Sequence, residues 1–136
     1  YQEHVFDTGA RGETEVLWVN YRSSDLCLNN LEKHVLTQQA IVPLTGEVLH
    51  VVARSLPDGS PDMATVAAFV VPPGQGVCMR THCWHSTRVA SEEVTCLMLT
   101  RRSTTADLVA HLESGQPAQE SAIAPVPAFT LQRPAV

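Results

Sequence analysis

The sequence has no excess of basic residues, no long apolar run and no internal repeat, and each absence narrows the class of protein. Nine Lys and Arg residues against fourteen Asp and Glu residues give a net charge of -5. A nucleic-acid partner requires a basic surface, so this balance argues against one. No apolar segment approaches the roughly 20 residues that a membrane span needs. We therefore expect a protein that binds neither nucleic acid nor membrane.

The four cysteines lack the close spacing of a disulfide or zinc scaffold. They are Cys27, Cys78, Cys83 and Cys96, and none forms a CxxC pair. A chain of 136 residues can build one hydrophobic core without cross-links, so we interpret the cysteines as the reduced thiols of a cytoplasmic protein. No signal-peptide pattern is present, and because the sequence begins at Tyr1, its natural start is left open.

Short segments rich in β-branched and apolar residues recur along most of the chain, separated by Gly and Pro turns. This pattern predicts an all-β sandwich or barrel in a single domain over residues 1–136. Thr45-Gly46 predicts a hairpin turn between two of the strands. The continuous apolar run Thr65–Val71 predicts a strand buried on both faces. The expected strands are Glu15–Tyr21, Leu26–Leu36, Gln39–Leu44, Glu47–Arg54, Thr65–Val71, Val77–Arg80, Trp84–Val89 and Val94–Thr100.

One helix is expected after these strands. Ser103, Thr104 or Thr105 can cap its start, and Gly115 ends it. Its apolar stripe consists of Ala106, Leu108, Val109 and Leu112. Residues 1–13 are expected to form an extended arm. Residues 116–136 are expected to form an irregular tail, because they contain four prolines.

Two polar clusters interrupt the apolar strands and predict a metal site. Glu32 and His34 share one face of a strand, and Gln38 or Gln39 can return to that face if the chain bends. The second cluster consists of Arg80, His82, His85 and Arg88, with Trp84 beside His85. Carboxylate and imidazole ligands suit a divalent ion such as nickel, zinc, manganese or iron.

Simpler structural roles for the same residues stay open. Glu32 and Lys33 can be solvated on an outer strand face, and His34 can be a buried histidine with a backbone partner. Arg88 can form a surface ion pair with Glu92 or Glu93. His50, in an apolar strand, is expected to belong to the core or an edge rather than to the site.

The segments Leu31–Gly46 (LEKHVLTQQAIVPLTG) and Val71–His85 (VPPGQGVCMRTHCWH), with Val51-Val52-Ala53, resemble the ureidoglycolate lyase family of cupins. The resemblance implies a double-sheet jelly-roll barrel and a homodimer. It also implies cleavage of ureidoglycolate to glyoxylate and urea, a step of allantoin and purine degradation. The implied cofactor is a divalent metal, with nickel usual for the family.

The residue roles implied by this resemblance are specific. The metal ligands would be Glu32, His34, Gln39 and His85. Simple alternation of side chains along a strand from His34 would favour Gln38 over Gln39. Glu32 or His85 would act as base or ligand, and His82 as the acid. The substrate carboxylate would bind Arg80 or Arg88, near Trp84.

The chain also departs from the family pattern. Arg80 stands in place of a family histidine, and Ser86 replaces the second of two adjacent histidines. His82 stands where a small or neutral residue is common. These departures leave two alternatives open: a different metal-dependent cupin enzyme acting on a hydroxy- or keto-acid, and a non-catalytic cupin that binds a small carboxylate.

Overall fold

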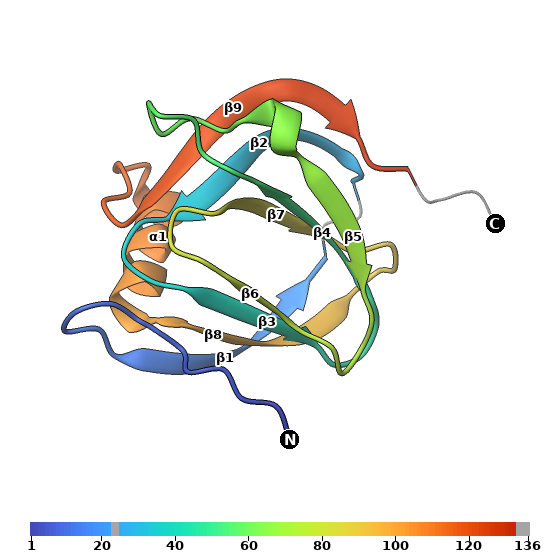
Figure 1. Cartoon of the computed structure of the whole chain (residues 1–136), viewed down its shortest axis with the longest axis horizontal. Helices are drawn as coiled ribbons and strands as arrows, with labels where there is room; N and C mark the ends of the chain where they lie inside the picture. Colours follow the sequence, from blue (N-terminus) through green and yellow to red (C-terminus); the bar gives the residue numbers. More distant parts are fainter. Residues whose placement is uncertain (23–24, 133–136) are drawn as a thin grey trace.

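The computed structural model describes residues 1–22 and 25–132 and folds them into two facing antiparallel β-sheets (Figure 1). One sheet has the strand order β1-β8-β3-β6 and the other β5-β4-β7-β2-β9. The strands are β1 (Thr14–Tyr21), β2 (Cys27–His34), β3 (Gln39–Pro43), β4 (Val48–Ala53), β5 (Ala67–Val71), β6 (Val77–Met79), β7 (Trp84–Arg88), β8 (Val94–Arg101) and β9 (Ser121–Thr130). A 3-10 turn, η1 (Met63–Thr65), precedes β5, and a helix, α1 (Arg102–Ser114), follows β8.

The strand pairing identifies the architecture. The first eight strands pair as β1 with β8, β2 with β7, β3 with β6 and β4 with β5. This nested pairing is that of a jelly roll, in which two Greek keys wrap one core. The all-β, cupin-type fold expected from the sequence is therefore confirmed, and β9 adds a strand beside β2.

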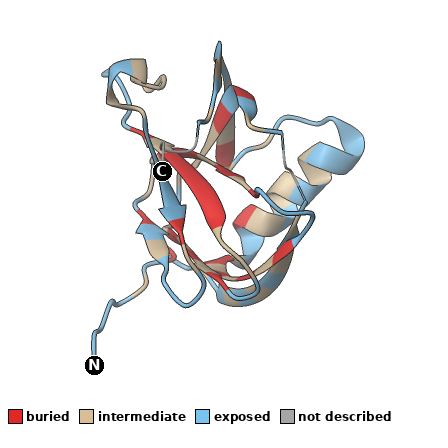
Figure 2. Ribbon diagram, turned by 90° about the vertical axis from the view of Figure 1, so that its right-hand side faces the viewer, coloured by how far each residue is buried: buried red, intermediate tan, exposed pale blue. Residues whose placement is uncertain are grey.

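The main core fills the space between the sheets. It contains Ile41, Val48, Val89, Val94 and Cys96, each at most 1% exposed. Alternation along the strands explains this core, because every second side chain of a strand points to the same face. Figure 2 shows the buried residues concentrated on the strands, while α1 is mostly intermediate or exposed.

The expected hairpin at Thr45-Gly46 is wrong. β3 pairs with β6 and β8, whereas β4 pairs with β5 and β7 in the opposite sheet. The short turn therefore carries the chain from one sheet to the other. A local turn signal cannot distinguish a hairpin from such a crossing, because both require the same compact turn.

The expectation that Thr65–Val71 is buried on both faces is also wrong. The strand β5 lies at the edge of its sheet, and four of its five residues are exposed. Helix α1 begins earlier than expected: Arg101 is its N-cap, and no side chain caps it there. Its end is as predicted, because Gly115 adopts φ 75° and its N–H bonds to the His111 carbonyl.

The expectation of an irregular tail is wrong for residues 121–130, which form β9 against β2. Proline lacks a backbone N–H and is tolerated in edge strands. Pro125 pairs with Asn30 on the edge strand, and Pro127 lies where the register shifts. Pro134 lies outside the described residues. Residues 1–13 contain no helix or strand, as expected of an arm.

The chain has no helix, within its described residues, whose length and apolar character would let it span a bilayer. All four cysteines are described and free.

Candidate metal and substrate site

Residues of both polar clusters meet where β2 pairs with β7. Glu32 of β2 lies directly opposite His85 of β7. Among residues 1–22 and 25–132, this is the single residue pair that joins the two strands. His34 follows two residues after Glu32 on β2, so both side chains point to the same face. The jelly-roll pairing thus brings together residues that are far apart in the sequence.

The three side chains converge on one point. Glu32 Oε1 lies 3.5 Å from His85 Nε2 and 3.9 Å from His34 Nε2. The two imidazole rings are tilted by 52°, with their centroids 5.0 Å apart. One candidate ligand atom from each of Glu32, His34 and His85 lies within 4.8 Å of the others. This spacing suits one small cation held between them.

The hydrogen bonds of the histidines leave their inner nitrogens available. His85 Nδ1 lies 3.0 Å from the Cys83 carbonyl oxygen, which only accepts, so Nδ1 carries a proton, and in the neutral tautomer Nε2 presents the lone pair. His34 Nδ1 lies 2.8 Å from Ser121 Oγ. Both Nε2 atoms are buried without a hydrogen-bond partner in the described chain. Buried polar atoms are normally paired, so two orphaned nitrogens beside a carboxylate fit a divalent metal.

The protonation states agree with this arrangement. Burial, aided by the neighbouring His85, lowers the pKa of His34 to about 4, although Glu32 and Gln39 oppose the shift. Burial alone would raise the pKa of Glu32, but His85 and His34 lower it below its usual value. At neutral pH the site therefore contains a neutral His34 and an ionised carboxylate, the forms that bind metals.

The structure places Gln39 rather than Gln38 beside this cluster. Gln39 is 8% exposed, lines the same cavity and donates from Nε2 to Met98 Sδ at 3.5 Å. The Gln39 side chain also interacts with His34, because it opposes the lowering of the His34 pKa. Gln38 faces outward and accepts from the backbone N–H of Asp7, which fastens the N-terminal arm.

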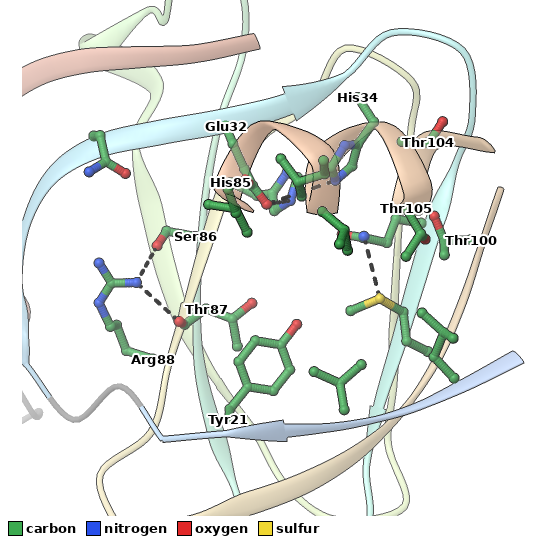
Figure 3. Close-up of a pocket in the computed structure, with 18 residues that line it drawn as sticks. Tyr21, Glu32, His34, His85, Ser86, Thr87, Arg88, Thr100, Thr104 and Thr105 are labelled. Carbon is green, nitrogen blue, oxygen red and sulfur yellow. Dashed lines mark hydrogen bonds and ion pairs between the residues drawn. The ribbon is translucent and has the colours of Figure 1, made fainter. Parts of the chain in front are cut away.

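A cavity of about 440 Å³ opens next to the cluster, between the two sheets and under α1 (Figure 3). Glu32, His34 and His85 lie at one side of it, and Tyr21 of β1 lies across from them (Figure 3). Burial raises the pKa of Tyr21, with Cys96 and Glu32 adding to the shift, so its phenol stays protonated. The apolar part of the wall comes from Leu17, Val19, Met98, Leu108, Val109 and Leu112.

Arg88 also lines the cavity, at the end of β7. Its Nε donates to the Asp25 carbonyl, and one terminal nitrogen donates to Ser86 Oγ at 2.8 Å and to the Thr87 carbonyl. No ion pair of Arg88 with Glu92 or Glu93 occurs in the described chain, and Glu93 instead pairs with Arg22. The guanidinium is therefore held in place by hydrogen bonds, and no carboxylate of the described residues forms an ion pair with it.

The structure does not bring the other expected residues to the cavity. Arg80 and His82 line a separate cavity of about 590 Å³. Trp84 is 2% exposed, packs in a second core cluster with Leu31 and Val51, and donates to the Gly59 carbonyl. It neighbours His85 in sequence, so strand alternation sends it to the opposite face.

Several cavity residues were not anticipated from the sequence. Tyr21, Thr87 and Thr100 line it from strands, and five residues of α1 line it as well: Thr104, Thr105, Leu108, Val109 and Leu112. Single threonines and a tyrosine in β-strands carry no distinguishing signal. The apolar stripe of α1 was recognised, but not that it faces a cavity. His50 is fully buried, as expected of a core residue, and contacts Thr87 and Met79.

Residues 3–119 match the model of a protein family described as ureidoglycolate lyase. A ureidoglycolate lyase of Escherichia coli (strain SMS-3-5 / SECEC) is 41% identical over 70 residues, which make up 52% of this chain and 43% of that protein. A ureidoglycolate lyase of Shigella boydii serotype 18 is 40% identical over 70 residues, which again make up 52% of this chain and 43% of that protein. The match thus spans less than half the length of these curated relatives.

A solved structure, a recombinant oxalate oxidase in complex with glycolate, superposes with a TM-score of 0.46 at 11% identity, covering 69% of this chain and 54% of that chain. The family match, which covers most of the chain, is the comparison that bears on function.

Proposed function

Because this chain belongs to the ureidoglycolate lyase family, we propose that it cleaves the C–N bond of ureidoglycolate and releases glyoxylate and urea. The observation that supports this most is the convergence of the Glu32 carboxylate with two orphaned imidazole nitrogens beside a cavity of about 440 Å³. The reaction would be a step of allantoin and purine degradation, and the free cysteines suit the cytoplasm.

The residues present fit a divalent metal. His34 and His85 would hold it through Nε2, Glu32 through one carboxylate oxygen and Gln39 through its amide oxygen. A nickel, zinc or manganese ion there would supply Lewis-acid polarisation of a substrate oxygen.

The reaction requires one proton to leave the substrate hydroxyl and one to reach the departing nitrogen. The lowered pKa of Glu32 keeps it ionised and able to accept the hydroxyl proton at its second oxygen. The C–O bond then becomes a carbonyl as the C–N bond breaks, and Glu32 returns the proton to the urea nitrogen. His82 lines another cavity, so this proposal assigns it no proton transfer.

Two further side chains would orient the substrate. The free terminal nitrogen of Arg88 would bind the carboxylate, because Ser86 and two carbonyls already fix the rest of the guanidinium. The protonated Tyr21 phenol would donate a hydrogen bond to a substrate oxygen from the opposite wall. The helix α1 would keep water from the site.

The test is to incubate the purified protein with ureidoglycolate, with and without added nickel or manganese, and to measure urea and glyoxylate. We expect release of both in equal amounts above the spontaneous rate. Release at the spontaneous rate under every metal condition would contradict the lyase activity and leave the fold unaffected.

A second candidate is another metal-dependent cupin reaction on a larger hydroxy- or keto-acid. The apolar wall formed by Leu108, Val109 and Leu112 of α1 favours it, because ureidoglycolate has no apolar group to contact that wall. It predicts bound metal and turnover of an acid with an apolar substituent, but not of ureidoglycolate. If the protein binds carboxylates but no metal, it is instead a non-catalytic binding protein.

We also propose a homodimer that forms through the outer face of the β1-β8-β3-β6 sheet. Val16 and Trp18 on β1 are 49% and 66% exposed. They pair with Leu99 and Leu97 of β8, so one apolar stripe crosses the sheet. Such a face can pack against its own copy about a two-fold axis. Light scattering should give a dimer mass, and Trp18→Lys should give a monomer; a wild-type monomer would contradict the proposal.

A further inference from the structure

The imidazole of His34 contacts β9 on the side away from Glu32, and the family match does not include that strand. His34 Nδ1 lies 2.8 Å from Ser121 Oγ. Both residues are buried, at 4% and 8% exposure, and they form a directly opposed pair of β2 and β9. Ser121 is the first residue of β9, and the matched region ends at residue 119.

The start of β9 is held firmly in place. The Glu120 carboxylate accepts hydrogen bonds from Ser103 Oγ at 3.0 Å and Thr104 Oγ1 at 2.9 Å, and pairs with Arg101. The Glu120 carbonyl accepts from the Val35 N–H just after β2. The Asp107 carboxylate of α1 accepts from the N–H groups of Gln119 and Glu120. These contacts hold the backbone at the start of β9 against β2 and keep Ser121 opposite His34.

A histidine that binds a metal through Nε2 must carry its proton on Nδ1. The Cys83 carbonyl imposes that tautomer on His85, because it only accepts hydrogen bonds. For His34, Ser121 Oγ is the Nδ1 partner that the described structure provides. A hydroxyl can accept a proton from Nδ1 and so hold both the tautomer and the ring orientation.

We propose that Ser121 is a positioning residue that presents the Nε2 lone pair of His34 to a divalent cation. The inference rests on the metal site of the proposed function. It adds Ser121 of β9 to that site, as a residue that contacts the ligand His34 rather than the metal. Partners that orient a ligating histidine commonly raise metal affinity about 10–100-fold. The geometry matches this role, since the Nδ1 contact lies opposite the orphaned Nε2.

The first measurement is nickel binding to the full chain by titration calorimetry. Ser121→Ala removes the hydroxyl, Ser121→Thr restores one, and Ala122→Gly loosens β9 at the adjacent residue while keeping Ser121. We expect Ser121→Ala to weaken nickel binding about 10–100-fold. Ser121→Thr should recover most of the affinity, and Ala122→Gly should match the wild type. If Ser121→Ala binds nickel as tightly as the wild type, or if Ala122→Gly weakens binding equally, the inference is overturned.

The second measurement uses the metal-free protein and separates this inference from the proposed function. Nitrogen-15 NMR of the imidazole reports which nitrogen of His34 carries the proton. We expect a single Nδ1–H tautomer in the wild type and a mixture in Ser121→Ala. If the wild type binds no nickel, the metal site of the proposed function fails, and the tautomer measurement alone decides the role of Ser121. An unchanged His34 tautomer in Ser121→Ala would then contradict it.

Discussion

His34 and His85 each bury a nitrogen that finds no partner within the described residues. An unsatisfied buried polar atom costs about 1–3 kcal/mol, so two of them side by side form an unfavourable arrangement for a purely structural core. The carboxylate of Glu32 lies within 4 Å of both nitrogens, which is too far for a good hydrogen bond but suits a shared cation. The candidate ligand atoms of Glu32, His34 and His85 thus surround one point, where a cation would bind.

Replacing Glu32 by Gln tests the proton-transfer role. The substitution keeps the size of the side chain but removes its basicity, so kcat for ureidoglycolate should fall about 10²–10⁴-fold. Glu93→Gln is the matched control, because Glu93 is a surface carboxylate paired with Arg22. Steady-state kinetics, with circular dichroism to verify folding, should show full activity for the control. Wild-type kcat in Glu32→Gln would contradict the role.

The buried His50 should make the protein sensitive to acid. Burial, aided by His85, lowers its pKa to about 4 from 6.5. Between these values the unfolded chain binds a proton that the folded chain excludes, so stability falls as the pH falls. The loss from pH 7 to pH 4.5 is on the order of 2–3 kcal/mol for this group.

Urea unfolding at pH 7 and pH 4.5 measures this loss. His50→Gln should be less stable at pH 7, because it disturbs the contacts with Thr87 and Met79, but its stability should change less between the two pH values. Equal losses in both proteins would show that His50 does not contribute to the acid sensitivity.

At the scale of elements, periodicity located the strands well but not their partners or their exposure. All eight predicted strands exist within a few residues of their expected bounds. The Thr45-Gly46 hairpin and the buried β5 failed because strand pairing depends on contacts between distant residues. The strand β9 was not predicted because it contains two prolines, which argue against a central strand. An edge strand tolerates proline, and β9 is an edge strand.

Helix α1 provides a prediction at this scale. Gly115 ends the helix with φ 75°, a conformation that costs a residue with a Cβ about 1 kcal/mol. No atom lies within 4 Å of the position where a Cβ would stand, so Gly115→Ala should lose this conformational energy without a steric clash. Chemical denaturation should show the loss. Stability equal to or above that of the wild type would contradict the account of how the helix ends.

At the scale of the whole molecule, the jelly roll explains which site residues could be foreseen. Glu32, His34 and Gln39 were grouped from spacing and resemblance, and the fold brings His85 to them through the β2–β7 pair. Trp84 and His85 adjoin in sequence but face opposite ways on β7. His82 sits at φ 69° in the bend before β7, and this bend directs it and Arg80 to the other cavity. The sequence predicts a bend at Thr81–Cys83, but residue spacing does not show the direction in which that bend turns its side chains.

The metal content of the purified protein tests the central claim most directly. The account predicts about one nickel, zinc or manganese ion per chain by elemental analysis after loading and dialysis, and loss of that ion in both Glu32→Ala and His85→Ala. His82→Ala should keep the ion, because His82 lines the separate cavity. Full metal content in the Glu32→Ala and His85→Ala variants would show that the ion binds elsewhere and would contradict the site described above.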